Sequence, residues 1–245
     1  MRRIQLCVAI ACALVAFAGC EPAPRSQLLI FSHTAGYRHT SIETGAESLK
    51  RLAENHNLIP VHTEDPNWFT DDSLASVAAV VVLNTTGDVL NAAQQADFER
   101  YIQAGGGYLG IHSASDTEYD WPWYGQLVGA YFENHPEIQH ADILVTDQSH
   151  VATRHLPAVW SRTDEWYNFV ERPTHVDVLA SIDEGSYDGG TMDGDHPVVW
   201  SREYDGGRAF YTAMGHTEES FSDSLFLGML DGALTWVIGD NKRNY

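Results

Sequence analysis

The chain has 245 residues, a length that favours one large domain over two full-sized ones. Hydrophobic residues make up 44% of the sequence and charged residues 20%, which excludes an intrinsically disordered chain, and three cysteines are too few for a disulfide scaffold. The formal net charge of -20 at pH 7, with no basic run, excludes a protein that binds nucleic acid through its phosphates.

The first element along the chain has the pattern of an export signal. Arg2 and Arg3 precede an apolar stretch from Ile4 to Phe17, as in a signal peptide. A membrane-spanning helix is the alternative, but this stretch ends before the roughly 20 apolar residues that such a helix needs. We therefore expect residues 1–19 to be a signal peptide.

The end of this signal, Phe17-Ala18-Gly19-Cys20, resembles the lipobox of bacterial lipoproteins. The resemblance implies that Cys20 is lipidated and that residues 20–27 form a lipidated tether. We expect residues 28–240 to form the domain. Cleavage without lipidation is the alternative. We expect a protein of the bacterial cell envelope that is anchored in the membrane by lipid and faces the periplasm or the exterior.

The first half of the domain alternates predicted strands and helices. Short apolar runs predict strands at residues 28–32, 58–62, 78–83 and 108–111. Residues 40–43 and 91–94 have the spacing of capping boxes, which predicts a helix start at each. The alternation predicts an α/β fold, a doubly wound sheet with helices on both faces.

The second half of the domain is less regular. Residues 138–147, 161–169 and 176–182 have the pattern of strands, and residues 198–214 predict a hairpin that turns at positions 205–207. Residues 221–238 predict a closing helix with an apolar face. We therefore expect the sheet to carry an added β-hairpin.

Histidines follow several of the predicted strands. His33 follows the first strand, His112 the fourth, and His216 the second strand of the hairpin. Ligands of doubly wound sheets bind beyond the carboxyl ends of the strands, where neighbouring strand ends lie together. We expect these imidazoles, together with Glu165, to meet in one pocket.

Motifs spread over the whole domain carry a family resemblance. They are, in chain order, HTAGYRHTSI at 33–42, GGGYLGIH at 105–112, the aromatic segment 121–136, DEWY at 164–167, and GRAFY at 207–211 with Gly215-His216. Together they resemble the ThuA-like family, named for trehalose utilisation. The resemblance implies a flavodoxin-like sheet similar to that of class I glutamine amidotransferases. Those enzymes present a nucleophilic cysteine on a strand-to-helix elbow, and no cysteine is available beside His112, which excludes a Cys-dependent amidotransferase.

Histidine and carboxylate chemistry remains, because the Gly-x-Ser-x-Gly elbow of serine hydrolases is also absent. We predict that His112, Glu165 and His216 are catalytic. The residues predicted to bind substrate are His33, Tyr37, Arg38, His39, Trp121 and Trp123. A divalent metal is a further option, and it would be held by ligands that the fold assembles, with His33, His112 and His216 as candidates. Each of these residues has a structural alternative, and core packing is the ordinary role of the two tryptophans.

Two functions follow from the resemblance and the residues. The first is an exported protein of carbohydrate metabolism, a hydrolase or lyase of glycosides, that acts on a saccharide or keto-sugar through histidine and carboxylate groups. The second is a non-catalytic domain that binds saccharide or serves as a scaffold. The site residues should share one open pocket in the first case and be scattered in a purely structural protein.

Overall fold

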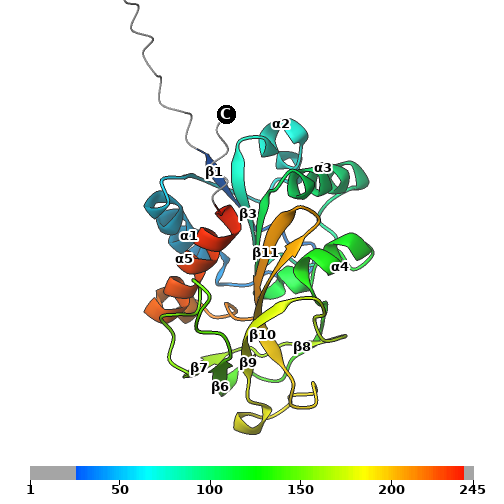
Figure 1. The fold of residues 1–245 in the computed structure, drawn as a ribbon. Helices are drawn as coiled ribbons and strands as arrows, with labels where there is room; N and C mark the ends of the chain where they lie inside the picture. Colours follow the sequence, from blue (N-terminus) through cyan, green and yellow to red (C-terminus); the bar gives the residue numbers. More distant parts are fainter. Residues whose placement is uncertain (1–25, 240–245) are drawn as a thin grey trace, which may run out of the picture.

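A nine-stranded sheet forms the centre of the computed structural model, which describes residues 26–239 (Figure 1). Its strand order is β2-β1-β3-β4-β11-β10-β9-β6-β7. In chain order these strands are β1 (Gln27–Phe31), β2 (Ile59–Thr63), β3 (Val77–Leu83), β4 (Gly107–Ile111), β6 (Gln139–Val145), β7 (Val159–Asp164), β9 (Asp177–Ile182), β10 (Pro197–Tyr204) and β11 (Gly207–Thr212). Two short strands pair apart from this sheet, β5 (Phe132–Asn134) and β8 (Asn168–Phe169).

The strands from β2 to β11 in this order are parallel, so their carboxyl ends share one edge of the sheet. The remaining strands pair antiparallel, beginning with the β10–β11 hairpin. The hairpin turns where Asp205 and Gly206 have φ values of 48° and 94°. The predicted α/β fold, a doubly wound sheet with an added hairpin, is confirmed.

Helices cover both faces of the sheet (Figure 1). On one face lie α1 (Ile42–Asn55) and α5 (Ser224–Ile238), and on the other lie α2 (Asp71–Leu74), α3 (Ala92–Gln103) and α4 (Pro122–Val128). The predicted apolar face of α1 is fully packed, since all its members are buried. They are Ile42, Ala46, Leu49, Leu52 and Ala53. Burial of these side chains stabilises the fold by about 1.5–3 kcal/mol for each large aliphatic residue.

Two local predictions need correction. The capping box expected at residues 40–43 is absent, because α1 begins after Ser41 and the hydroxyl of Ser41 donates to the carbonyl oxygen of Gly215 instead. The box expected at Asn91 and Gln94 is present. The strand predicted at 161–169 is divided into β7 and β8, since the chain leaves the sheet at residues 165–167.

The predicted signal peptide, Cys20 and most of the tether lie outside the described residues. From residue 26 to residue 239, no helix combines the length and apolar character required to span a bilayer.

Candidate functional site

His112 stands at the carboxyl end of β4, where the chain enters a 3₁₀ turn, His112–Ser115. Its φ of 50° lies in the left-handed region, which residues other than glycine seldom adopt. The imidazole is fully buried, and its Nδ1 lies 2.7 Å from the carbonyl oxygen of Ala213. A carbonyl only accepts, so Nδ1 carries a proton and donates it to Ala213, while Nε2 faces His216 and Glu165.

Four side chains meet at this point: His39, His112, Glu165 and His216. One nitrogen or oxygen atom from each lies within 4.8 Å of the others. His112 Nε2 is 3.1 Å from His216 Nδ1 and 3.4 Å from Glu165 Oε2. His216 Nδ1 is also 3.1 Å from Glu165 Oε2. The ring of His39 packs edge-on against both other imidazoles, with centroid distances of 4.9 and 5.0 Å.

Each member of this cluster comes from a different part of the chain. His39 lies between β1 and α1, His112 follows β4, Glu165 follows β7, and His216 lies beyond β11. The parallel part of the sheet brings His39, His112 and His216 to one edge. Glu165 arrives from the antiparallel extension.

Burial and charge decide the protonation states in the cluster. Burial, with the neighbouring His112 and His216, lowers the pKa of His39 to about 2, so this imidazole is neutral at physiological pH. Burial alone would raise the pKa of Glu165, but hydrogen bonds from His112 and His216 outweigh it and hold that pKa well below its usual range. The cluster therefore offers a carboxylate and at least one neutral imidazole.

Asp164, the residue before Glu165, holds the backbone of two cluster members in place. Its buried carboxylate accepts from the backbone N–H groups of Glu165, Gly215 and His216 at 3.0–3.1 Å. Arg162 donates to the same carboxylate at 3.0 Å. The two cluster members on these segments are thus fixed relative to each other through one side chain.

The cluster borders a pocket of about 430 Å³. Its lining residues are Tyr37, His39, Asp116, Phe132, His135, Glu165, Tyr167 and His216. The ring of Tyr167 lies against that of His112 at 4.1 Å and that of Phe132 at 4.2 Å. No lysine or arginine of residues 26–239 belongs to this lining.

The structure brings together His112, Glu165 and His216, and Tyr37 and His39 share their pocket. His33 was expected beside them but lies outside the pocket, where its Nδ1 donates to the carbonyl oxygen of Glu64. His39, six residues further along the chain, takes that place.

Three other predicted substrate contacts also lie outside the pocket lining. Arg38 forms ion pairs with Glu43 and Glu64 at 2.7 and 2.9 Å. Trp121 and Trp123 stack on each other at 5.2 Å and contact the ring of Phe98 on α3. These contacts are those of packing residues, and a role in substrate binding stays a prediction.

Four lining residues are not among the predicted site residues: Asp116, Phe132, His135 and Tyr167. Asp116 follows the turn after β4, and Tyr167 lies two residues beyond Glu165. Proximity to a predicted strand end was an available signal for Asp116, and Tyr167 belongs to the DEWY motif at 164–167. Phe132 and His135 lie in the aromatic segment 121–136, where no predicted strand ends.

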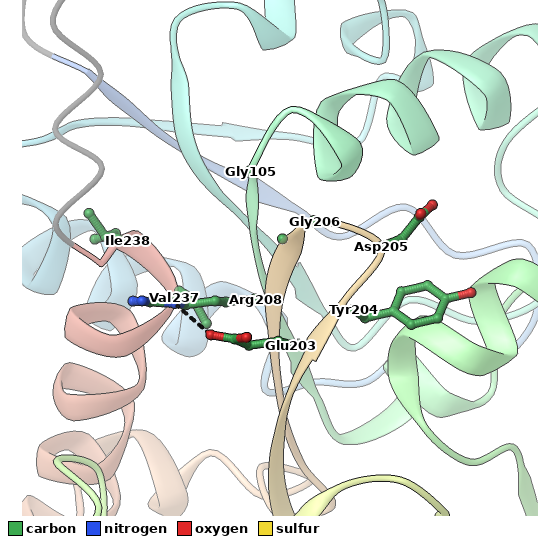
Figure 2. A pocket seen from close by; sticks show the side chains of 9 residues that line it. Gly105, Glu203, Tyr204, Asp205, Gly206, Arg208, Val237 and Ile238 are labelled. Atoms are coloured by element: carbon green, nitrogen blue, oxygen red, sulfur yellow. Dashed lines mark ion pairs between the residues drawn. The ribbon is translucent and has the colours of Figure 1, made fainter.

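A second pocket, of about 330 Å³, lies at the opposite end of the sheet, beside the β10–β11 turn (Figure 2). Arg208 lies within it, donates to the carbonyl oxygen of Trp236, and is 4.0 Å from Glu203. No histidine from the described part of the chain lines this pocket. The clustered histidines and Glu165 therefore lie at the carboxyl edge of the sheet, away from this second pocket.

Comparison with known proteins agrees with this architecture. The family model for ThuA, described as trehalose utilisation, matches residues 27–237. A ThuA-like protein from Bacteroides uniformis ATCC 8492 is 25% identical, with a TM-score of 0.77 over 92% of this chain and 96% of its own. Another from Parabacteroides merdae ATCC 43184 is 19% identical, with a TM-score of 0.71 over 88% and 90%. Part of a β-galactosidase from Bacillus circulans sp. alkalophilus shares the fold, at 13% identity and a TM-score of 0.55 over 86% of this chain and 31% of the enzyme. Comparison with curated proteins finds no match.

Proposed function

The chain belongs to the ThuA (trehalose utilisation) family, and from this membership we propose that it is an exported enzyme that acts on an uncharged saccharide or keto-sugar at a divalent metal. The observation that carries the proposal is the cluster of His39, His112, Glu165 and His216 beside an aromatic pocket. Histidine and carboxylate chemistry at one open site distinguishes this function from that of a scaffold.

The ligand set suits a divalent transition metal. Imidazole nitrogens and carboxylate oxygens bind such ions at about 2.0–2.2 Å, so two ligands of one ion lie roughly 3.0–3.5 Å apart. Three donor separations in the cluster, between His112, His216 and Glu165, are 3.1–3.4 Å. The N–H of His112 that binds Ala213 is the outer contact that commonly orients a ligating histidine.

Such an ion would polarise a carbonyl or hydroxyl oxygen of the sugar. The protein supplies flat apolar surfaces for the C–H faces of the ring, from Tyr37, Phe132 and Tyr167. Two carboxylates, Asp116 and Glu165, line the pocket, and no lysine or arginine between residues 26 and 239 does. The lining therefore has no cationic side chain to pair with a sugar phosphate, which supports an uncharged substrate.

The experiment measures metal and turnover together. Protein purified without chelator is analysed for its elements, and turnover is measured on trehalose, its keto derivative and a set of chromogenic glycosides. We expect about one metal ion per chain. His112→Ala should lose both metal and activity, whereas the control His140→Ala, at an exposed position of β6, should keep both.

Background metal content together with undiminished activity in His112→Ala would remove the site from the mechanism. Calorimetric binding of a saccharide by the wild type, without turnover of any substrate, would favour the non-catalytic alternative.

Export is a separate part of the proposal. The pattern of residues 1–19 and the lipobox-like end at Cys20 support a lipid anchor that holds the enzyme in the cell envelope. Cys20→Ser should release the mature protein from the membrane fraction. Equal retention of wild type and variant would contradict lipidation.

A further inference from the structure

A second carboxylate faces the candidate site from the segment after β4. Asp116 follows the 3₁₀ turn that begins at His112, and it lines the same pocket as His39, Glu165 and His216. It is half-buried and does not belong to the four-residue cluster. Asp116 is not one of the four proposed metal ligands, so its position in the pocket calls for a different role.

The contacts of Asp116 fix the residue and leave one oxygen available. Its backbone N–H donates to the carbonyl oxygen of Ser113, and its carbonyl oxygen accepts from the N–H of Gly87, both at 2.8 Å. The hydroxyl of Tyr119 donates to Oδ1 at 2.6 Å. From residue 26 to residue 239, no donor lies within hydrogen-bond distance of Oδ2.

The other titratable groups of the pocket are less suited to exchange a proton with a substrate. Three of them belong to the ligand cluster. Burial raises the pKa of Tyr167 well above its usual value, so its hydroxyl stays protonated. Tyr37 is 63% exposed. His135 has its Nδ1 2.9 Å from the carbonyl oxygen of Pro136 and 3.1 Å from Glu165 Oε1.

We propose that Asp116 is the general base of this site, a catalytic residue whose Oδ2 takes a proton from a hydroxyl group of the bound sugar. The inference rests on the proposed function. In this step the substrate O–H bond breaks, its electron pair stays on the substrate oxygen, and an O–H bond forms on Asp116. The proton returns to an oxygen of the product, which regenerates the carboxylate.

The surroundings of Asp116 support this role. Burial raises the pKa of its carboxyl group, and the Tyr119 hydrogen bond and His112 oppose the rise. The titratable groups that face it are Tyr119 from its own segment, His112 from the end of β4, Tyr167 from the segment after β7, and Tyr211 from β11. Activity that needs the carboxylate is lost as pH falls through this raised pKa, above the usual range of an aspartate.

The test compares the metal-loaded wild type with Asp116→Asn, Asp116→Glu and the control Asp120→Asn. Asp120 is exposed and outside the pocket, so the control makes the same chemical change nearby. The substrates are trehalose, its keto derivative and chromogenic glycosides, assayed between pH 4 and 8, and kcat and KM are determined separately. Metal content and Tm are measured for each protein.

Asp116→Asn should lower kcat roughly 100- to 10,000-fold, the usual contribution of general acid–base catalysis. Its metal content should be unchanged and its Tm equal or higher, because a half-buried carboxylate has become neutral. Asp116→Glu should retain partial activity with a displaced acid limb, and Asp120→Asn should match the wild type.

Activity of Asp116→Asn within tenfold of the wild type, with the same acid limb, would overturn the proposal while the proposed function stands. Loss of metal in Asp116→Asn would also overturn it, because the residue would then act by assembling the site. If His135→Asn abolished turnover and Asp116→Asn did not, the base would be His135. A wild type that turns over none of the substrates defeats the proposed function and this inference together.

Discussion

Asp164, the last residue of β7, should be the most sensitive position behind the candidate site. Its side chain is fully buried. Its carboxylate accepts from five groups, the backbone N–H of Glu165, Gly215 and His216, the hydroxyl of Ser220 and the guanidinium of Arg162. Asp164→Ala removes all five acceptor contacts at once.

The expected loss can be worked out from these contacts. Arg162 is 8% exposed and lies between the rings of Trp160 and Phe226, at 4.7 and 4.8 Å from their centroids. Its nearest other carboxylate is that of Asp223, at 3.6 Å. Removing one partner of a buried ion pair costs about 3–5 kcal/mol, and each buried donor left unsatisfied about 1–3 kcal/mol. Because these costs overlap, we expect a loss of at least about 4 kcal/mol from a total stability of about 5–15 kcal/mol.

Urea unfolding followed by circular dichroism measures this loss. Asp164→Asn should be intermediate, because its remaining oxygen can still accept from two backbone N–H groups. The exposed Asp177 at the start of β9 supplies the control, and Asp177→Ala should change the free energy of unfolding by less than about 0.5 kcal/mol. A loss below about 1 kcal/mol in Asp164→Ala would refute the reasoning that this carboxylate holds the two segments together.

Three further outcomes are expected. Burial lowers the pKa of His196 in the folded protein, although Tyr167 and Glu184 oppose this, so the unfolded chain takes up the proton at a higher pH than the folded one. Stability should therefore fall from pH 7 to pH 5, and His196→Gln should show a shallower fall when urea unfolding is measured at both pH values. Tyr37→Ala should raise KM for saccharides several-fold without lowering Tm, since this ring is 63% exposed; an unchanged KM would place it outside the binding site. Gly107→Ala should destabilise the fold by about 1–3 kcal/mol, because a Cβ there would lie 2.6 Å from the carbonyl oxygen of Val237; a Tm equal to that of the wild type would show that α5 can shift.

The parallel half of the fold is well predicted because its sequence signals are local. The Val-rich run at 77–83 is buried on both faces of the sheet, and the predicted face of α1 packs as expected. The local predictions are wrong where a side chain makes its hydrogen bonds with residues that are distant in the sequence. The hydroxyl of Ser41 does not cap α1. It donates to the carbonyl oxygen of Gly215, 174 residues away, and accepts from the side-chain amide of Asn84, 43 residues away. Nothing in the local spacing reports such partners.

The site is predicted in part for the same reason. His112 and His216 follow strands whose order in the sheet makes them neighbours, since β4 pairs with β11. His33 also follows a strand, but its side chain turns toward the carbonyl of Glu64 beyond β2. His39 reaches the cluster from the loop before α1. The path of the loop between β1 and α1 decides whether His33 or His39 points into the cluster. The position of a residue after a predicted strand does not determine that path.

The triple glycine before His112 serves internal packing. Gly106 and Gly107 are needed because a Cβ at these positions would meet the ring of Tyr101 and the end of α5. They let the chain pack closely against Tyr101 and α5. Gly105 has a φ of 88° at the end of α3, and His112 has a φ of 50° although it is not a glycine.

His112 connects the fold to its chemistry. A non-glycine residue held at a φ of 50° stores about 1–3 kcal/mol of strain, which persists only where surrounding contacts impose it. Those contacts are present, because its Nδ1–H binds the carbonyl oxygen of Ala213 and its own carbonyl oxygen accepts from the hydroxyl of Tyr211. Both partners belong to β11 or the residue after it, the strand that leads to His216. The turn that strains the backbone therefore also directs the imidazole toward the second histidine.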